Sequence, residues 1–104
     1  MRHKEFTIVL LDDEAKIHVW FDVDKGKVVR FAINLVWIES EKTNDVYRID
    51  TCHGFLHEQK FWISNEPKRL DMNVHNAFNE KLKEVKENYS KMIRALKRSK
   101  RKFK

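Results

Sequence analysis

The sequence has few of the residues that cross-link a chain or alter its backbone flexibility: one cysteine, one proline and two glycines among 104 residues. A single cysteine excludes an internal disulfide framework and a zinc site built from several cysteines. A lone thiol is typical of a reducing compartment, so we expect a cytoplasmic protein. With so little glycine and proline, no flexible linker is expected, and the length favours a single domain.

Long hydrophobic runs are also missing. No stretch approaches the roughly 20 apolar residues that span a bilayer, so we predict no membrane partner. The short apolar run near the N-terminus has no small-residue cleavage site, and we therefore expect no signal peptide. The chain does contain 41% hydrophobic and 12% aromatic residues, which is enough to form a packed core.

Charge is divided unevenly along the chain. Residues 81–104 hold 11 Lys and Arg against two Glu, a net charge of +9, whereas residues 1–80 carry −3. We expect a single α+β domain over residues 1–98 and a basic tail at 99–104. The basic end predicts binding to nucleic acid or to an acidic partner, through Lys97, Arg98, Lys100, Arg101 and Lys102. A merely solubilising tail would carry the same charge run.

Alternating apolar and polar residues predict an antiparallel sheet of about five strands in a meander. The expected strands lie at residues 6–11, 16–23, 27–40, 46–52 and 59–63. A break in the pattern at residues 64–68 contains Pro67, which cannot extend a central strand.

The register of the first hairpins can be predicted from the apolar rows. A three-residue turn at 24–26, with Gly26 left-handed, pairs Phe21 with Val29 and keeps both apolar rows on one face. A two-residue turn would place the rows on opposite faces. For the next hairpin we expect a turn over residues 41–45, which would bring Leu35 near Ile49 and Trp37 near Tyr47.

From about Val74 the apolar period becomes helical. Phe78, Leu82, Val85, Tyr89, Met92 and Leu96 recur three or four residues apart. We predict a helix from Val74 to Lys97, with Asp71 or Asn73 as its N-cap and its apolar stripe on one face of the sheet. A coiled-coil dimer is the alternative use of this stripe. The predicted fold is therefore an antiparallel α+β sheet with one face covered by a long C-terminal helix.

The stretch from Tyr47 to Trp62 concentrates the residue types that do chemistry. With a turn at residues 54–56, His53 faces His57 at the hairpin mouth, about 4.5–5.5 Å apart at Cβ. This register also pairs Asp50 with Lys60 and Arg48 with Trp62 on the outer face, and it avoids like-charge pairs. The predicted catalytic residues are His53, His57, Arg48 and Asp50.

Two facing imidazoles can act as an acid and a base, grip a phosphate or share a metal ion. A metal needs more ligands, and Cys52 and Asp50 lie on the opposite strand face from His53 in this register. We therefore predict no metal and no cofactor. The structural alternative is that His53 bonds the turn backbone and His57 caps the strand.

The predicted outer face of the sheet mixes aromatic and basic side chains. Trp20, Arg30 and Trp62 are its candidate nucleic-acid-binding residues, because aromatic rings stack on bases and guanidinium groups hold phosphates. An ordinary solvated face with cross-strand pairs is the alternative.

The hairpin motif resembles the shared stretch of a group of small archaeal and bacterial proteins, some of which are similar to TumE-like toxins of toxin–antitoxin pairs. The resemblance covers about residues 27–63, and its matching positions are Arg48, Asp50, His53 and His57. It implies an RNA-directed, toxin-like activity and an antitoxin-like protein partner.

Two functions from different classes follow. The first is a small protein that acts on nucleic acid, RNA in preference to DNA, as a toxin-like ribonuclease using the histidine pair. The second is a non-catalytic module that binds nucleic acid or a protein, with the helix stripe as a dimer interface. The sequence leaves monomer and homodimer both open.

Overall fold

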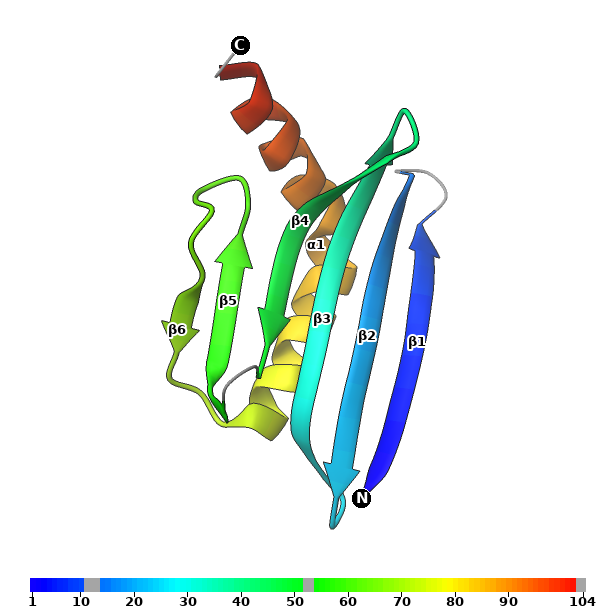
Figure 1. The fold of residues 1–104 in the computed structure, drawn as a ribbon, viewed down its shortest axis with the longest axis vertical. Coiled ribbons are helices and arrows are strands. Elements are labelled where there is room, and N and C mark those ends of the chain that lie inside the picture. The colour runs from blue at the N-terminus through cyan, green and yellow to red at the C-terminus, as the bar shows by residue number, and fades with distance from the viewer. Residues whose placement is uncertain (11–13, 52–53, 103–104) are drawn as a thin grey trace.

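A computed structural model describes residues 1–10, 14–51 and 54–102, with side chains described as far as Lys100. Six antiparallel strands lie in chain order in one sheet, and one long helix packs on it (Figure 1). The elements are β1 (Arg2–Leu10), β2 (Ala15–Asp24), β3 (Lys27–Glu39), β4 (Lys42–Asp50), β5 (Leu56–Lys60), β6 (Lys68–Leu70) and α1 (Val74–Lys102).

The predicted fold class is confirmed, with six strands in place of five. The additional strand, β6, has only three residues and follows Pro67 directly. Three residues are too few to show an alternating pattern, so the sequence carries no signal for it. The second and third strands lie close to their predicted bounds, whereas β1 and β4 begin four residues earlier than expected.

The β2–β3 hairpin corrects the predicted three-residue turn. Asp24 pairs with Lys27, so the turn holds only Lys25 and Gly26, both with positive φ (52° and 78°). Such a turn matches the twist of the strands. The register then shifts by one residue, because Val29 is an extra residue opposite the step from Asp22 to Val23. This bulge realigns the apolar rows, and Phe21 pairs with Phe31.

A second bulge corrects the β3–β4 register. The turn is Ser40–Glu41, again with positive φ at both residues (49° and 66°), and β4 starts inside the predicted turn. Leu35 pairs with Tyr47 and Ile33 with Ile49, two residues away from the predicted partners. Val46 is the extra residue, and both it and Tyr47 are fully buried.

The core lies between the sheet and α1. Phe78 of the helix contacts Phe21 and Phe31, with ring centroids 4.8 Å and 5.3 Å apart. The prediction that the helical stripe packs on the sheet is confirmed. Asn73, one of the two predicted caps, accepts a hydrogen bond from the Asn76 amide at 3.1 Å.

The helix is longer than the sequence pattern predicted. It continues from Lys97 to Lys102 without a break, so most of the expected basic tail is helical. The division into a domain at 1–98 and a tail at 99–104 stays a prediction. Within the described chain, α1 is the sole α-helix, and it is not apolar enough to cross a membrane.

A buried polar network fastens α1 to the sheet. Tyr47 Oη donates a hydrogen bond to Glu58 Oε2 over 2.5 Å, and Lys81 Nζ lies 3.0 Å from the same oxygen. Burial alone would raise the pKa of Glu58, but the bonds from Tyr47 and Lys81 outweigh it and lower the pKa. Burial likewise opposes the charge of Lys81, whose bond to Glu58 nevertheless raises its pKa. The network therefore keeps Glu58 ionised and Lys81 protonated.

Candidate functional site

The β4–β5 hairpin differs most from its prediction. His57 pairs with Asp50, and Gln59 pairs with Arg48. The predicted pairing of His57 with His53 is wrong, and His53 itself lies outside the described residues. Because the register differs by three residues, the strand faces are exchanged. Asp50 and His57 now share the outer face of the sheet, where Arg48 also lies.

The same shift corrects the other predicted pairs of this hairpin. Lys60 pairs with Tyr47 and not with Asp50. Trp62 does not face Arg48, because β5 ends at Lys60 and Trp62 belongs to the following turn. Its side chain is partly buried against the hydrophobic core. Trp62 is therefore not part of the outer face.

Hydrogen bonds made by Thr51 explain why β4 ends where it does. The Thr51 amide donates to the Phe31 carbonyl at 3.1 Å, and the Phe31 amide donates to Thr51 Oγ1 at 3.1 Å. Gly54 then donates its amide to the Thr51 carbonyl at 3.2 Å and has φ of 83°. Glycine adopts this left-handed conformation without a steric penalty. Thr51 thus keeps the end of β4 bonded to β3, and Gly54 provides the turn that leads into β5.

One row of residues crosses the outer face from strand to strand. Its order is Glu5, Trp20, Ala32, Asp50, His57 and Arg69. Ala32 separates Trp20 from Asp50, which lie two strands and about 10 Å apart. Because the alanine side chain is a single methyl group, a hollow forms above it.

This hollow is a pocket of about 520 Å³. Its lining combines an indole ring, two guanidinium groups and a carboxylate with small and aliphatic residues: Trp20, Val29, Arg30, Ala32, Arg48, Asp50, Thr51, Gly54 and Val74. Four of the predicted site residues, Trp20, Arg30, Arg48 and Asp50, are therefore brought together. His57 is the cross-strand neighbour of Asp50 beside this pocket.

Two ion pairs order the charged groups around the pocket. Arg48 Nε lies 2.8 Å from Asp50 Oδ2, and Arg30 Nε lies 3.1 Å from Asp22 Oδ2. Both carboxylates are mostly covered, whereas both arginine side chains are more than half exposed. Each pair occupies one of the five N–H donors of its guanidinium group. The arginines can therefore contact a bound anion while the carboxylates hold them in place.

Aromatic rings extend the outer face on both sides of the pocket. The Phe55 and His57 rings have centroids 4.4 Å apart, and the Arg69 guanidinium lies 4.5 Å from the Phe55 ring centre. At the other side, His3 stacks on Trp20 with centroids 5.8 Å apart. Hydrogen bonds to Glu5 and Asp22 raise the pKa of His3, which favours its cationic form. The face therefore carries aromatic and cationic groups from β1 to β6.

The basic end of α1 lies elsewhere. Lys97 Nζ is 4.7 Å from the centre of the Trp37 ring, and Lys100 Nζ donates to Asn44 Oδ1 at 2.6 Å. Both contacts are on the helix side of the sheet. Arg98 is exposed, and the side chains of Arg101 and Lys102 lie outside the description. The predicted basic residues and the outer-face pocket therefore do not form one continuous site.

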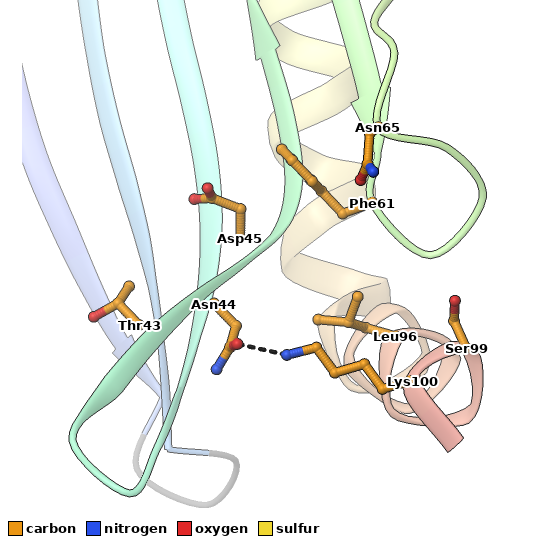
Figure 2. A pocket seen from close by; sticks show the side chains of 8 residues that line it. All are labelled: Thr43, Asn44, Asp45, Phe61, Asn65, Leu96, Ser99 and Lys100. Carbon is orange, nitrogen blue, oxygen red and sulfur yellow. Dashed lines mark hydrogen bonds between the residues drawn. The ribbon is translucent and has the colours of Figure 1, made fainter. Parts of the chain in front are cut away.

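A second pocket, of about 590 Å³, opens beside this basic end (Figure 2). It lies between the β3–β4 hairpin, the chain after β5 and the last turns of α1, with Lys100 reaching across to Asn44. Leu96 and Phe61 supply its apolar lining. It contains none of the residues predicted to be catalytic.

Several residues of the outer site were missed in the sequence. Ala32, Thr51, Phe55 and Arg69 were not singled out, although each now has a defined place in it. Ala32 was the most detectable, because it is the one small residue in the strongly apolar stretch of β3. Arg69 could not be found, since its strand carried no pattern.

Among the described residues, no group of three His, Cys, Asp or Glu side chains is placed to hold a metal ion. The pocket on the outer face combines cationic and aromatic groups with the carboxylate of Asp50.

Comparison with known proteins gives a family but no function. No curated protein and no solved structure matches the chain significantly. A family model described as a domain of unknown function matches residues 1–102, which include the whole sheet and the helix. The chain therefore belongs to the DUF7718 family.

Proposed function

We propose that the protein acts on RNA, with the outer face of the sheet as the binding surface and His57, Asp50 and Arg48 as a phosphodiester-cleaving centre. One observation carries this proposal: the β4–β5 register sets Asp50 opposite His57 on the face where Arg48 lies over Asp50. An imidazole can transfer protons at a phosphate ester, a carboxylate can orient the imidazole, and a guanidinium can stabilise the charge that develops.

The reaction would use the ribose itself as the nucleophile. His57 would take the proton from a 2′-hydroxyl as that oxygen attacks the adjacent phosphorus, and the bond to the 5′-oxygen would break. The leaving 5′-oxygen must gain a proton, for which His53 is the candidate. Arg48 and Arg30 would neutralise the charge that develops on the phosphoryl oxygens. No metal ion or cofactor enters this scheme.

Substrate binding would follow the physics of single-stranded nucleic acid. The pocket over Ala32 is open to a planar base that stacks on Trp20, and Phe55 offers a further ring along the same row. Arg30, Arg48 and Arg69 would contact the backbone phosphates. The basic end of α1, through Lys97, Arg98 and Lys100, would attract the rest of a longer RNA without sharing the site.

A toxin-like biological role is part of the same proposal. Arg48, Asp50 and His57, three positions of the motif that resembles TumE-like toxins, lie on one face. A cytoplasmic toxin with an antitoxin-like partner is the biological role that this resemblance implies. The alternative is a face that binds RNA without cleaving it, which requires Trp20 and the arginines but not the histidines.

The test separates cleavage from binding. Purified wild type, H57A and the H53A/H57A double variant are incubated with total RNA, and binding of a fluorescent single-stranded RNA is measured in parallel. His18→Ala is the matched control, because His18 lies on the same face but bonds Thr7 at 3.0 Å and does not line the pocket.

We expect H57A to lose about 100-fold or more in cleavage rate, as for a lost general base, with RNA binding retained. Equal cleavage by wild type, H57A and H18A would identify a contaminating nuclease and reject the catalytic proposal. Intact RNA with wild type, together with binding that W20A and R48A weaken, would leave the non-catalytic alternative.

A further inference from the structure

The helix covers only part of the sheet. In Figure 1, α1 passes behind β3 and β4, whereas β1 and β2 have no element drawn behind them. The register places alternate residues of these two strands on the helix side, among them Phe6, Ile8 and Leu10 of β1 and Phe21 of β2. The helix-side row of β1 therefore lies beside the core without a helix behind it, whereas on β2 Ala15, Ile17 and Val19 are buried and Phe21 contacts Phe78 of α1.

Five apolar residues of this face are incompletely buried. Phe6 is 39% exposed, and Ile8, Leu10, Phe21 and Val23 are only partly buried beside the core. Phe6 and Phe21 contact edge to face, with centroids 6.5 Å apart. The residues Phe6, Ile8, Leu10, Phe21 and Val23 are called the β1–β2 apolar face below. Phe6 is the exposed member of this set, and it continues a row of partly buried apolar side chains, as at an interaction site.

One flank of α1 borders this face. Lys81 reaches Glu58 on β5, so the opposite flank of the helix turns toward β2. His75 on that flank accepts a hydrogen bond from the Val28 amide at 3.1 Å, which confirms its direction. Leu82 and Tyr89 follow at helical spacing and are partly buried hydrophobic residues. They add an apolar wall to the β1–β2 apolar face.

The charged residues of β1, β2 and α1 that border this surface are basic, whereas Glu14, beyond the end of β1, is acidic. Among residues 2–10 and 15–24, the helix-side rows contain Arg2 and Lys4 and no acidic residue. The adjoining flank of α1 carries Lys86 and Lys97 at the spacing of Leu82 and Tyr89, again with no acidic residue. The helix places Glu80, Glu84 and Glu87 on its other side, where Glu84 contacts Lys81. The apolar face is therefore edged by positive charge.

We propose that the β1–β2 apolar face docks an amphipathic helix of another protein, with an apolar stripe flanked by acidic residues. Such a helix would lie beside α1 and complete the second layer of the sheet. β1 is nine residues long, about 30 Å, which a helix of about 20 residues matches. A second copy of this chain is the poorer occupant, because pairing two such faces would bring their lysines and arginines together.

The proposal is independent of RNA binding and is tested with two designed peptides. Both are about 20 residues long with the same leucine stripe; one has glutamate on its polar face and the other lysine. Binding to the full-length protein is followed by fluorescence anisotropy of labelled peptide. We expect the glutamate peptide to bind at least about tenfold more tightly than the lysine peptide.

Three variants place the peptide on the molecule. Phe6→Asp should abolish binding of the glutamate peptide, and Lys86→Glu should weaken it several-fold while strengthening the lysine peptide. Val9→Asp is the matched control, because Val9 is 56% exposed on the other face of the same strand. Lys86 is exposed on the helix surface, so K86E tests the proposal even where F6D does not fold.

Equal affinity of the two peptides, or an effect of V9D as large as that of F6D, would overturn the proposal. Analytical sedimentation of the wild type and Phe6→Asp tests whether a second copy of the chain occupies the face. Self-association of the wild type that Phe6→Asp removes and that competes with the glutamate peptide would show that a second copy occupies the face, and the acidic partner would be rejected.

Discussion

Two ion pairs differ in their exposure to solvent. One joins Glu58 of β5 to Lys81 of α1, and the other joins Arg48 to Asp50 within β4. On the helix side, Glu58 is 8% exposed and is held by both Tyr47 and Lys81. On the outer face, Arg48 bonds Asp50 but keeps more than half of its own side chain in solvent. The difference teaches which charges maintain the fold and which are available to a ligand. The covered pair has its groups occupied by protein, whereas the open pair presents donors outward.

Breaking the covered pair should have the largest effect on stability. Lys81→Met removes the cation and leaves the buried Glu58 carboxylate with the hydrogen bond from Tyr47 but without its ion-pair partner. We expect a loss of about 2–3 kcal/mol in the free energy of unfolding, below the range for a fully buried pair because Lys81 keeps some solvent contact. Lys83→Met, at an exposed position of the same helix, should change it by less than about 0.5 kcal/mol. Urea denaturation measures both, and equal effects would show that the pair has no special role.

Acid should distinguish the two pairs next. The pKa of Glu58 is lowered in the folded protein, so its stabilising contribution is present above the unfolded pKa of about 4.5 and is lost as the pH falls further. Wild type should therefore lose more unfolding free energy between pH 6 and pH 3 than E58Q. Parallel curves for the two proteins would contradict the assigned charge state of Glu58.

Breaking the open pair should have the smallest effect on stability and a clear effect on RNA. Arg48→Gln should change the free energy of unfolding by no more than about 0.5–1 kcal/mol, since exposed ion pairs contribute little. Under the proposed function it should also weaken RNA binding about tenfold and reduce its salt dependence. A large loss of stability with unchanged RNA binding would make Arg48 a structural residue like Lys81.

The sequence pattern predicted most of the elements but not the register in which the strands pair. The alternation of apolar residues predicted five of the six strands and the helix, though not all of their bounds, because burial on one face leaves a period in the sequence. Register depended on Val29 and Val46, the two bulge residues, which are ordinary valines in apolar stretches. Each extra residue reverses which side chains face the core, and no local residue type announces it.

The residues of the candidate site were also identified without their correct register. Arg48, Asp50 and His57 were identified from residue type alone, but the predicted register divided them between two faces. The actual connection is longer than a tight turn, since Thr51 remains bonded to Phe31 before the chain returns at Leu56. Lys97 was predicted to bind nucleic acid, and its contact with Trp37 depends on how a helix far along the chain packs across β3.

The sequence by itself determined the α+β class, a helix N-cap at Asp71 or Asn73, the basic C-terminal end and the residue types from which a site could be made. Those features follow from local periodicity, capping and composition. Only the tertiary structure decided that Asp50 faces His57, that Ala32 opens a pocket beside Trp20, and that the helix-side row of β1 lies outside the path of α1. These arrangements depend on bulges and on the path of α1 across the sheet, which set long-range contacts without leaving a local pattern.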